Sequence, residues 1–75
     1  MEKIRVKDLL YLTGGNTKVI IGDCFNIDNI FVERWRGIVD DVDLDNLIWD
    51  GMPCSDRCIE HITVVNGEDW LQIWT

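Results

Sequence analysis

Three cysteines and a single histidine are the residues in this chain whose types could hold a metal ion. Cys54, Cys58 and His61 follow a C-x3-C-x2-H spacing, and Cys24 could complete a set of four zinc ligands. Structural zinc sites usually present two close ligand pairs, whereas Cys24 stands alone and Cys58 and His61 fall on one strand with opposite side-chain directions. We therefore expect reduced, buried thiols with no metal and no other cofactor, and zinc stays as the alternative.

A run of aspartates between residues 40 and 50 is the clearest charge feature. The first 36 residues hold five acids and six bases, whereas the remainder holds nine acids against Arg57 alone, in a chain of net charge -7. Such an acidic surface repels phosphate backbones and attracts basic surfaces, which favours a basic protein partner over nucleic acid. The candidate partner-binding carboxylates are Asp40, Asp41, Asp43, Asp45 and Asp50.

The same aspartates raise the question of calcium. Asp41, Asp43 and Asp45 are spaced like the first three ligands of a calcium loop. Asn46 stands where that loop needs its turn glycine, and Met52 where it needs a bidentate glutamate. A helix start rich in aspartate is the simpler interpretation, because carboxylates there accept bonds from unpaired backbone N–H groups.

Tryptophan is abundant, with four residues in 75, and two of the four lie close together near the end of the sequence. On a regular strand Trp70 and Trp74 share one face, while Leu71 and Ile73 share the other. If Leu71 and Ile73 face the core, the tryptophans are exposed beside two acids and become candidate anchors for a basic partner. The alternative is a sheet covered on both faces, with the tryptophans in the core.

Nothing in the sequence singles out a catalytic group. The chain has one histidine to serve as a base, and it shows neither a glycine-rich phosphate loop nor a nucleophile elbow. Carboxylates are numerous, but no pair is set apart in surroundings that would raise one pKa. We expect a non-enzymatic protein.

The order of hydrophobic runs and turn residues predicts the elements. Val6, Leu9 and Leu10 recur at helical spacing before Gly14. Turn residues Asn26, Asp28 and Asn29 lie between two apolar runs, as does the Asn-Gly pair that begins at Asn66, so we expect a hairpin at each place. Residues 50–53 are turn residues that close the second helix. We expect a lead-in strand at 1–5, helices at 6–13 and 41–48, and strands at 17–24, 30–36, 58–65 and 70–74. This predicts one α+β domain over residues 1–75, with a small four-stranded, mainly antiparallel sheet and one or two short helices. No apolar stretch is long enough for a signal peptide or membrane span, so we expect a cytoplasmic protein.

Two motifs near the start of the chain resemble those of a known group of proteins. Residues 3–10 followed by 17–21 resemble the "I-x-V-x-D-L-L … T-x-V-x-I" start common among small proteins of phages and other mobile elements of gut Firmicutes. Residues 35–37 and the closing apolar hairpin are also similar to that group. The resemblance implies a phage or prophage origin and carries over neither an activity nor any functional residue. Small acidic phage proteins resemble anti-CRISPR proteins, which inhibit host defence nucleases.

Two functions follow as hypotheses. The first is an acidic inhibitor that occupies the basic nucleic-acid-binding surface of a host defence nuclease, using the five aspartates with Trp70 and Trp74. The second is a structural or accessory module that forms a homodimer through a free edge strand at 71–74.

Overall fold

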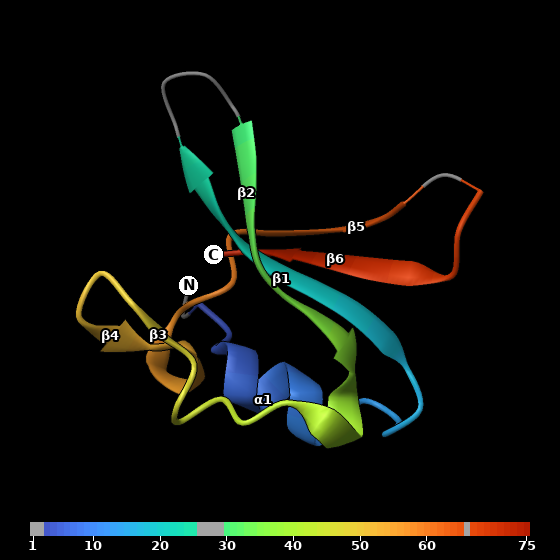
Figure 1. Cartoon of the computed structure of the whole chain (residues 1–75), viewed down its shortest axis with the longest axis horizontal. Helices are drawn as coiled ribbons and strands as arrows, with labels where there is room; N and C mark the ends of the chain where they lie inside the picture. Colours follow the sequence, from blue (N-terminus) through green and yellow to red (C-terminus); the bar gives the residue numbers. More distant parts are fainter. Residues whose placement is uncertain (1–2, 26–29, 66) are drawn as a thin grey trace.

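A four-stranded sheet forms the centre of the molecule, and the computed structural model describes residues 3–25, 30–65 and 67–75 (Figure 1). The expected turn at Asn26, Asp28 and Asn29, and Asn66 of the Asn-Gly turn, lie outside these described residues. The elements in chain order are α1 (Val6–Tyr11), β1 (Lys18–Phe25), β2 (Ile30–Ile38), the 3-10 turn η1 (Val39–Asp41), β3 (Ile48–Trp49), β4 (Met52–Pro53), the 3-10 turn η2 (Cys54–Asp56), β5 (His61–Val64) and β6 (Trp70–Trp74).

The strand order of the sheet is β2-β1-β6-β5. β1 pairs with β2, and β5 with β6, as antiparallel neighbours, so both predicted hairpins are confirmed. β1 and β6 are parallel, with Lys18 opposite Trp70 and Gly22 opposite Trp74. The α+β class and the four strands are confirmed, but the sheet is mixed. Local turn residues predict hairpins, whereas the parallel pairing joins segments about 50 residues apart and leaves no local pattern.

The position of β6 corrects the expectation that residues 71–74 form a free edge strand. β6 lies between β1 and β5, so both of its edges are already paired within the chain. A second copy therefore cannot pair with this strand as it would with an edge strand.

The core lies on one face of the sheet. Val19, Ile21 and Ile73 are fully buried there and pack against Val6 and Leu10 of α1. Trp49 and Cys54 belong to the same cluster, so the loops between β2 and β5 complete the cover (Figure 1). We call this the covered face. The opposite face of the sheet, the open face, has no helix of the described residues over it.

The predicted helix at 41–48 is wrong. After η1 the chain runs through an irregular segment in which Asn46 N–H donates to the Asp43 carbonyl, and β3 then begins at Ile48. The carbonyls of this segment do not form a helical ladder, because those of Leu44 and Leu47 accept hydrogen bonds from the backbone N–H groups of residues 54–55. Aspartates spaced two apart favour turns over helix interiors, and the pairing across to residues 54–55 prevails over the weak apolar periodicity.

The predicted lead-in strand and third strand are shorter than expected. Residues 1–2 lie outside the described chain, and Arg5 makes a single bridge to Cys58. Ile59 N–H donates to the Ile4 carbonyl at 2.7 Å, so the N-terminal segment pairs with the approach to β5. No helix among the described residues is long and apolar enough to cross a membrane.

Candidate functional site

Five carboxylates, Asp40, Asp41, Asp43, Asp45 and Asp50, form what we call the acidic segment. Its first residue is placed by contacts with the loop after α1. Asp40 N–H donates to the Gly15 carbonyl at 3.0 Å, and Val39 N–H donates to the Thr17 carbonyl at 3.0 Å. A Cβ atom at Gly15 would collide with the Asp40 carboxylate, so the glycine permits this close approach.

Apolar side chains hold the rest of the segment against the core. Val39, Val42, Leu44 and Leu47 pack on the buried cluster, and the intervening aspartates are exposed. This in-and-out alternation turns the carboxylates toward solvent without a regular helix. Buried anchors of this kind limit the freedom of the loop, so less ordering is required when the carboxylates bind.

Asp50 lies at the tip of the β3–β4 hairpin. Its φ is 53°, and that of Gly51 is 76°, which is the backbone of a two-residue type I′ turn. Asp-Gly is a favoured pair for that turn, because aspartate tolerates the left-handed region and glycine adopts it freely. The turn residues recognised in the sequence are therefore in a turn, although it joins two strands and does not close a helix.

Among the described residues the acidic segment makes no ion pair, which is also true of Asp8, Asp56, Glu68 and Asp69, whereas three other acids are paired. Glu33 pairs with Arg36 at 2.7 Å, Asp23 lies 3.6 Å from Arg34, and Glu60 pairs with Lys3. Within residues 3–25, 30–65 and 67–75, none of the five aspartates makes an ion pair. Their partner among these residues is Asn46, whose amide donates to the Asp43 carboxylate at 2.6 Å.

A shallow depression borders the acidic segment. It lies between α1 and the 39–45 loop and is lined in part by Lys7, Tyr11, Asp43, Asp45 and Ser55. The depression is open to solvent and shows none of the enclosure that a water-excluding active site needs.

Trp70 and Trp74 lie on the open face, on the other side of the sheet from the acidic segment. Leu71 and Ile73 point to the covered face, as one of the two sequence alternatives required. The tryptophans are half-buried and not freely exposed. The structure therefore does not bring the two parts of the predicted binding surface together.

Neighbouring side chains on the open face pack against both tryptophan rings. Lys18 and Arg36 lie over the Trp70 ring, at 5.8 and 5.1 Å from its centroid. Trp74 packs beside Phe31 and His61, with ring centroids 5.1 and 5.5 Å apart. Cation–π and edge-on aromatic contacts of this kind keep the rings in place.

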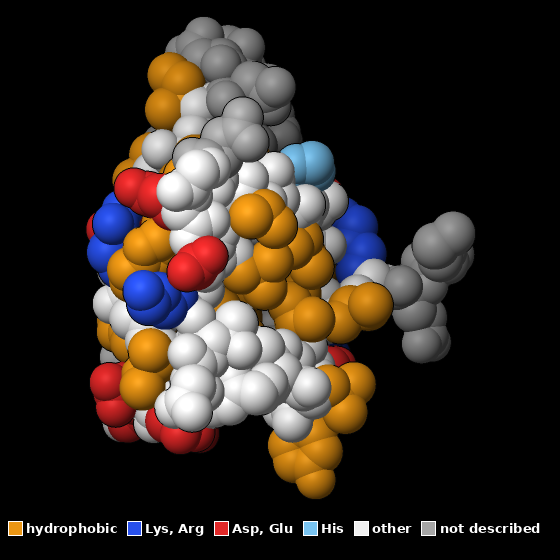
Figure 2. Space-filling view, turned by 90° about the vertical axis from the view of Figure 1, so that its right-hand side faces the viewer, with side chains coloured by type: hydrophobic (Ala, Val, Ile, Leu, Met, Phe, Trp, Pro, Cys, Tyr) orange, Lys and Arg blue, Asp and Glu red, His pale blue; other side chains and the backbone are white. Residues whose placement is uncertain are grey.

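The Trp74 indole N–H also donates to the Gln72 side-chain oxygen at 2.7 Å. Figure 2 shows one side of the molecule, with hydrophobic side chains gathered near its middle, the pale-blue histidine at their upper edge, and basic and acidic side chains together on the left.

Cys54, Cys58 and His61 are not brought together as zinc ligands in the described part of the chain. Cys54 is fully buried, Cys58 is half-buried, His61 is exposed beside Trp74, and the Cys24 side chain lies outside the described part of the chain. No group of three His, Cys, Asp or Glu that could hold a metal occurs among the residues described. Burial raises the pKa of the Cys54 thiol to about 11, with Arg57 acting weakly in the other direction. A thiol that stays protonated at neutral pH is a poor nucleophile.

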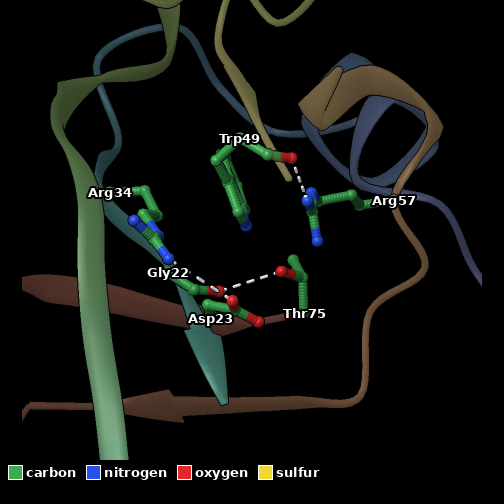
Figure 3. Close-up of polar contacts among 6 residues, drawn as sticks. All are labelled: Gly22, Asp23, Arg34, Trp49, Arg57 and Thr75. Carbon is green, nitrogen blue, oxygen red and sulfur yellow. Dashed lines mark hydrogen bonds and ion pairs between the residues drawn. The ribbon is translucent and has the colours of Figure 1, made fainter. Parts of the chain in front are cut away.

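A cluster of two arginines around Trp49 was not predicted from the sequence. The Arg57 guanidinium lies 4.1 Å from the Trp49 ring centroid, and Arg34 lies 5.7 Å from it (Figure 3). Arg57 also donates to the Trp49 carbonyl, and Arg34 approaches Asp23. The Trp49 indole and Arg57 Nε nitrogens are buried and have no partner among the described residues.

This cluster helps to position the β3–β4 hairpin. Arg57 follows η2 and contacts Trp49, and the Trp49 ring is buried in the core, so both contacts hold the β3–β4 hairpin that bears Asp50 against the rest of the domain. Arg34, Trp49 and Arg57 are separated by 15 and 8 residues and follow no helix or strand period, so no sequence signal could have grouped them. Arg57 was visible only as the one base in an acidic half.

No protein-family model, curated protein or solved structure matches the chain, so the site rests on its own geometry.

Proposed function

We propose that this protein is a non-enzymatic binding protein whose acidic segment docks on a basic protein surface of the kind that normally holds nucleic acid. The observation that carries the proposal is the set of five exposed aspartates that make no ion pair among the described residues. The expected consequence is inhibition of a nucleic-acid-handling enzyme, since its lysines and arginines are occupied.

The physical argument concerns charge that is fixed and unneutralised. Carboxylates already paired within the chain must give up a partner before they bind another cation, whereas those of the acidic segment need not. Adjacent negative charges steer a basic surface to them over long range and compete with phosphates for the same side chains. Anchoring by Val42, Leu44 and Leu47 lowers the ordering cost of binding.

We restrict the proposed surface to the acidic segment. Trp70 and Trp74 were candidate anchors for the same partner, but they lie across the sheet and already contact Lys18, Arg36, Phe31 and His61. One rigid partner surface would have to wrap around the sheet to reach both.

The test is inhibition of DNA cleavage by a panel of purified RNA-guided nucleases, with the protein titrated at low and high salt. We expect inhibition of at least one nuclease, relieved by added duplex DNA and weakened by salt, because screening shortens the range of the attraction. The triple variant Asp41→Asn, Asp43→Asn and Asp45→Asn removes three charges of the acidic segment and should lose about tenfold or more in inhibitory potency.

A matched control removes the same number of charges elsewhere. Glu33→Gln, Glu68→Gln and Asp69→Asn change three exposed acids outside the acidic segment, and this triple variant should inhibit nearly as well as the parent. Equal loss in both triple variants would reduce the effect to net charge. Full potency in the acidic-segment variant, or no inhibition of any nuclease in the panel, would contradict the proposal.

A further inference from the structure

Within the described part of the chain, β5 is an edge strand, and one side of it is left unpaired. In the order β2-β1-β6-β5 it has β6 on one side, and no described residue pairs with its other side. Val65 N–H donates to the Trp70 carbonyl at 3.1 Å, which makes Val65 and Trp70 a hydrogen-bonded pair. Because such pairs alternate along an antiparallel ladder, the N–H and C=O groups of Ile62 and Val64 point away from β6.

The side chains of the same two residues are apolar and exposed. Ile62 and Val64 lie opposite Ile73 and Leu71, so they belong to the covered face of the sheet. They are nevertheless 42% and 66% exposed, and the core cluster includes no residue of β5. The cover of α1 and its neighbouring loops therefore ends before it reaches this strand.

The other edge of the sheet is protected, which makes β5 stand out. β2 carries Glu33, Arg34 and Arg36, and its register with β1 is broken by an irregularity beside Gly22. Charged side chains and bulges are the usual devices that keep an edge strand from pairing with another chain. β5 reads His-Ile-Thr-Val, without an acid, a lysine, an arginine or a proline.

We propose that β5 pairs with β5 of a second copy, antiparallel about a two-fold axis through Thr63. In this register Ile62 lies opposite Val64 of the other copy, and each such pair exchanges both of its backbone hydrogen bonds. The two four-stranded sheets become one continuous sheet, and the exposed Ile62 and Val64 side chains of both copies form one apolar strip.

Self-complementarity favours a second copy over a different chain. Ile62 and Val64 are symmetrically placed about Thr63, so the strand opposes itself with one apolar residue against another and threonine against threonine. Each copy carries a net charge of -7, and β5 itself has no acid, lysine or arginine, so pairing this strand with its copy brings no like charges of the strand together. The inference does not depend on the proposed function, because the acidic segment takes no part in the contact.

Sedimentation equilibrium of the full chain over a range of concentrations is the first test. We expect a monomer–dimer equilibrium that tightens with added salt, since screening reduces repulsion between the two acidic copies. Val64→Lys places a charge against the partner strand and should raise the dimer dissociation constant about tenfold or more. Ile30→Lys is the matched control, because it puts the same charge at a 51% exposed position on β2 and should change the constant less than about twofold.

A cross-link tests the register. The two Thr63 residues would form a non-hydrogen-bonded pair with Cα atoms about 4.5 Å apart, which is within the range of a disulfide. Mild oxidation of the Thr63→Cys variant should give a covalent dimer well above the background that the native cysteines give in the parent, and adding Val64→Lys should suppress it.

A chain that stays monomeric at high concentration would overturn the proposal. So would an equal effect of Ile30→Lys, an association that salt weakens, or a Thr63→Cys variant that cross-links no more than the parent. The triple change of Asp41, Asp43 and Asp45 to Asn should leave the dimer intact or tighter. Failure of dimerisation and failure of nuclease inhibition are thus separate results.

Discussion

The open face of the sheet and the acidic segment treat charge in opposite ways. On the open face, Arg36 pairs with Glu33 and both Arg36 and Lys18 lie over Trp70, so the charged groups are engaged within the molecule. In the acidic segment, the apolar side chains of the 39–47 loop are partly buried against the core, and the aspartates between them make no ion pairs among the described residues. The contrast teaches that a large aromatic content does not by itself mark a binding surface, because the aromatic rings can already be packed against side chains of the same chain.

The largest expected effect compares the packing of the two faces. Ile73→Ala truncates a fully buried residue of the covered face and should lower the free energy of unfolding by about 3 to 4 kcal/mol. Ile20→Ala does the same on the open face, where Ile20 is 3% exposed beneath shallower cover, and should cost about 2 kcal/mol. Urea unfolding measures both, and equal costs would mean that the open face is as much a core as the covered one.

The next effect concerns the contact between Arg57, which follows η2, and the hairpin that bears Asp50. Arg57→Met removes a cation 4.1 Å from the Trp49 centroid and the donor to the Trp49 carbonyl, and should cost about 2 kcal/mol. Arg5→Met is the control, because Arg5 is exposed and should lose little. Thermal or urea unfolding gives the difference, and equal stability of both variants would show that Arg57 does not anchor the hairpin.

A smaller effect comes from the alkaline titration of Cys54 on the covered side. Burial raises the pKa of this thiol from 9.0 to about 11, so the folded state favours its protonated form. The resulting stability is fully present below pH 9 and is lost as the pH rises toward 11, because the unfolded chain releases its proton first.

The matched measurement uses Cys54→Ala. The free energy of unfolding of the parent should fall between pH 8 and pH 10.5 by more than that of the variant, because other alkaline titrations are common to both. If the two proteins lose stability in parallel over this range, the thiol is not buried as described.

The smallest effect tests the open face again. Glu33→Gln breaks an ion pair between two exposed side chains, and it should leave the urea midpoint unchanged within error. The same change should free Arg36, whose pKa is raised by its hydrogen bond with Glu33. A clear loss of stability would show that the charge pairing on this face is structural and not incidental.

Local patterns predicted the parts of the fold that depend on neighbours in sequence. The strand at Trp70–Trp74, the two hairpins and the start of α1 at Val6 follow from alternation, turn residues and helical spacing. The parallel pairing of β1 with β6 was not predicted, since it depends on which strand edges meet when the two hairpins pack together. The helix at 41–48 was wrong because bonds to residues 54–55 were invisible in the sequence.

The candidate site divides in the same way. Exposure of the aspartates could be predicted, because charged side chains between apolar ones turn outward. The partners of Trp70 and Trp74 could not, because Lys18, Arg36, Phe31 and His61 come from three other strands. The open β5 edge was also hidden, since identifying an edge requires the strand order of the whole sheet.

The parallel contact between β1 and β6 has a consequence for how the molecule folds. β6 joins the β1–β2 hairpin to β5, and its partners in β1 are about 50 residues earlier in the chain. Closing so long a loop is slow, and the buried Ile73 cannot enter the core until it has happened. During synthesis one edge of β1 therefore stays unpaired until Trp70 to Trp74 have left the ribosome. Cooperative folding of the domain is then a late event.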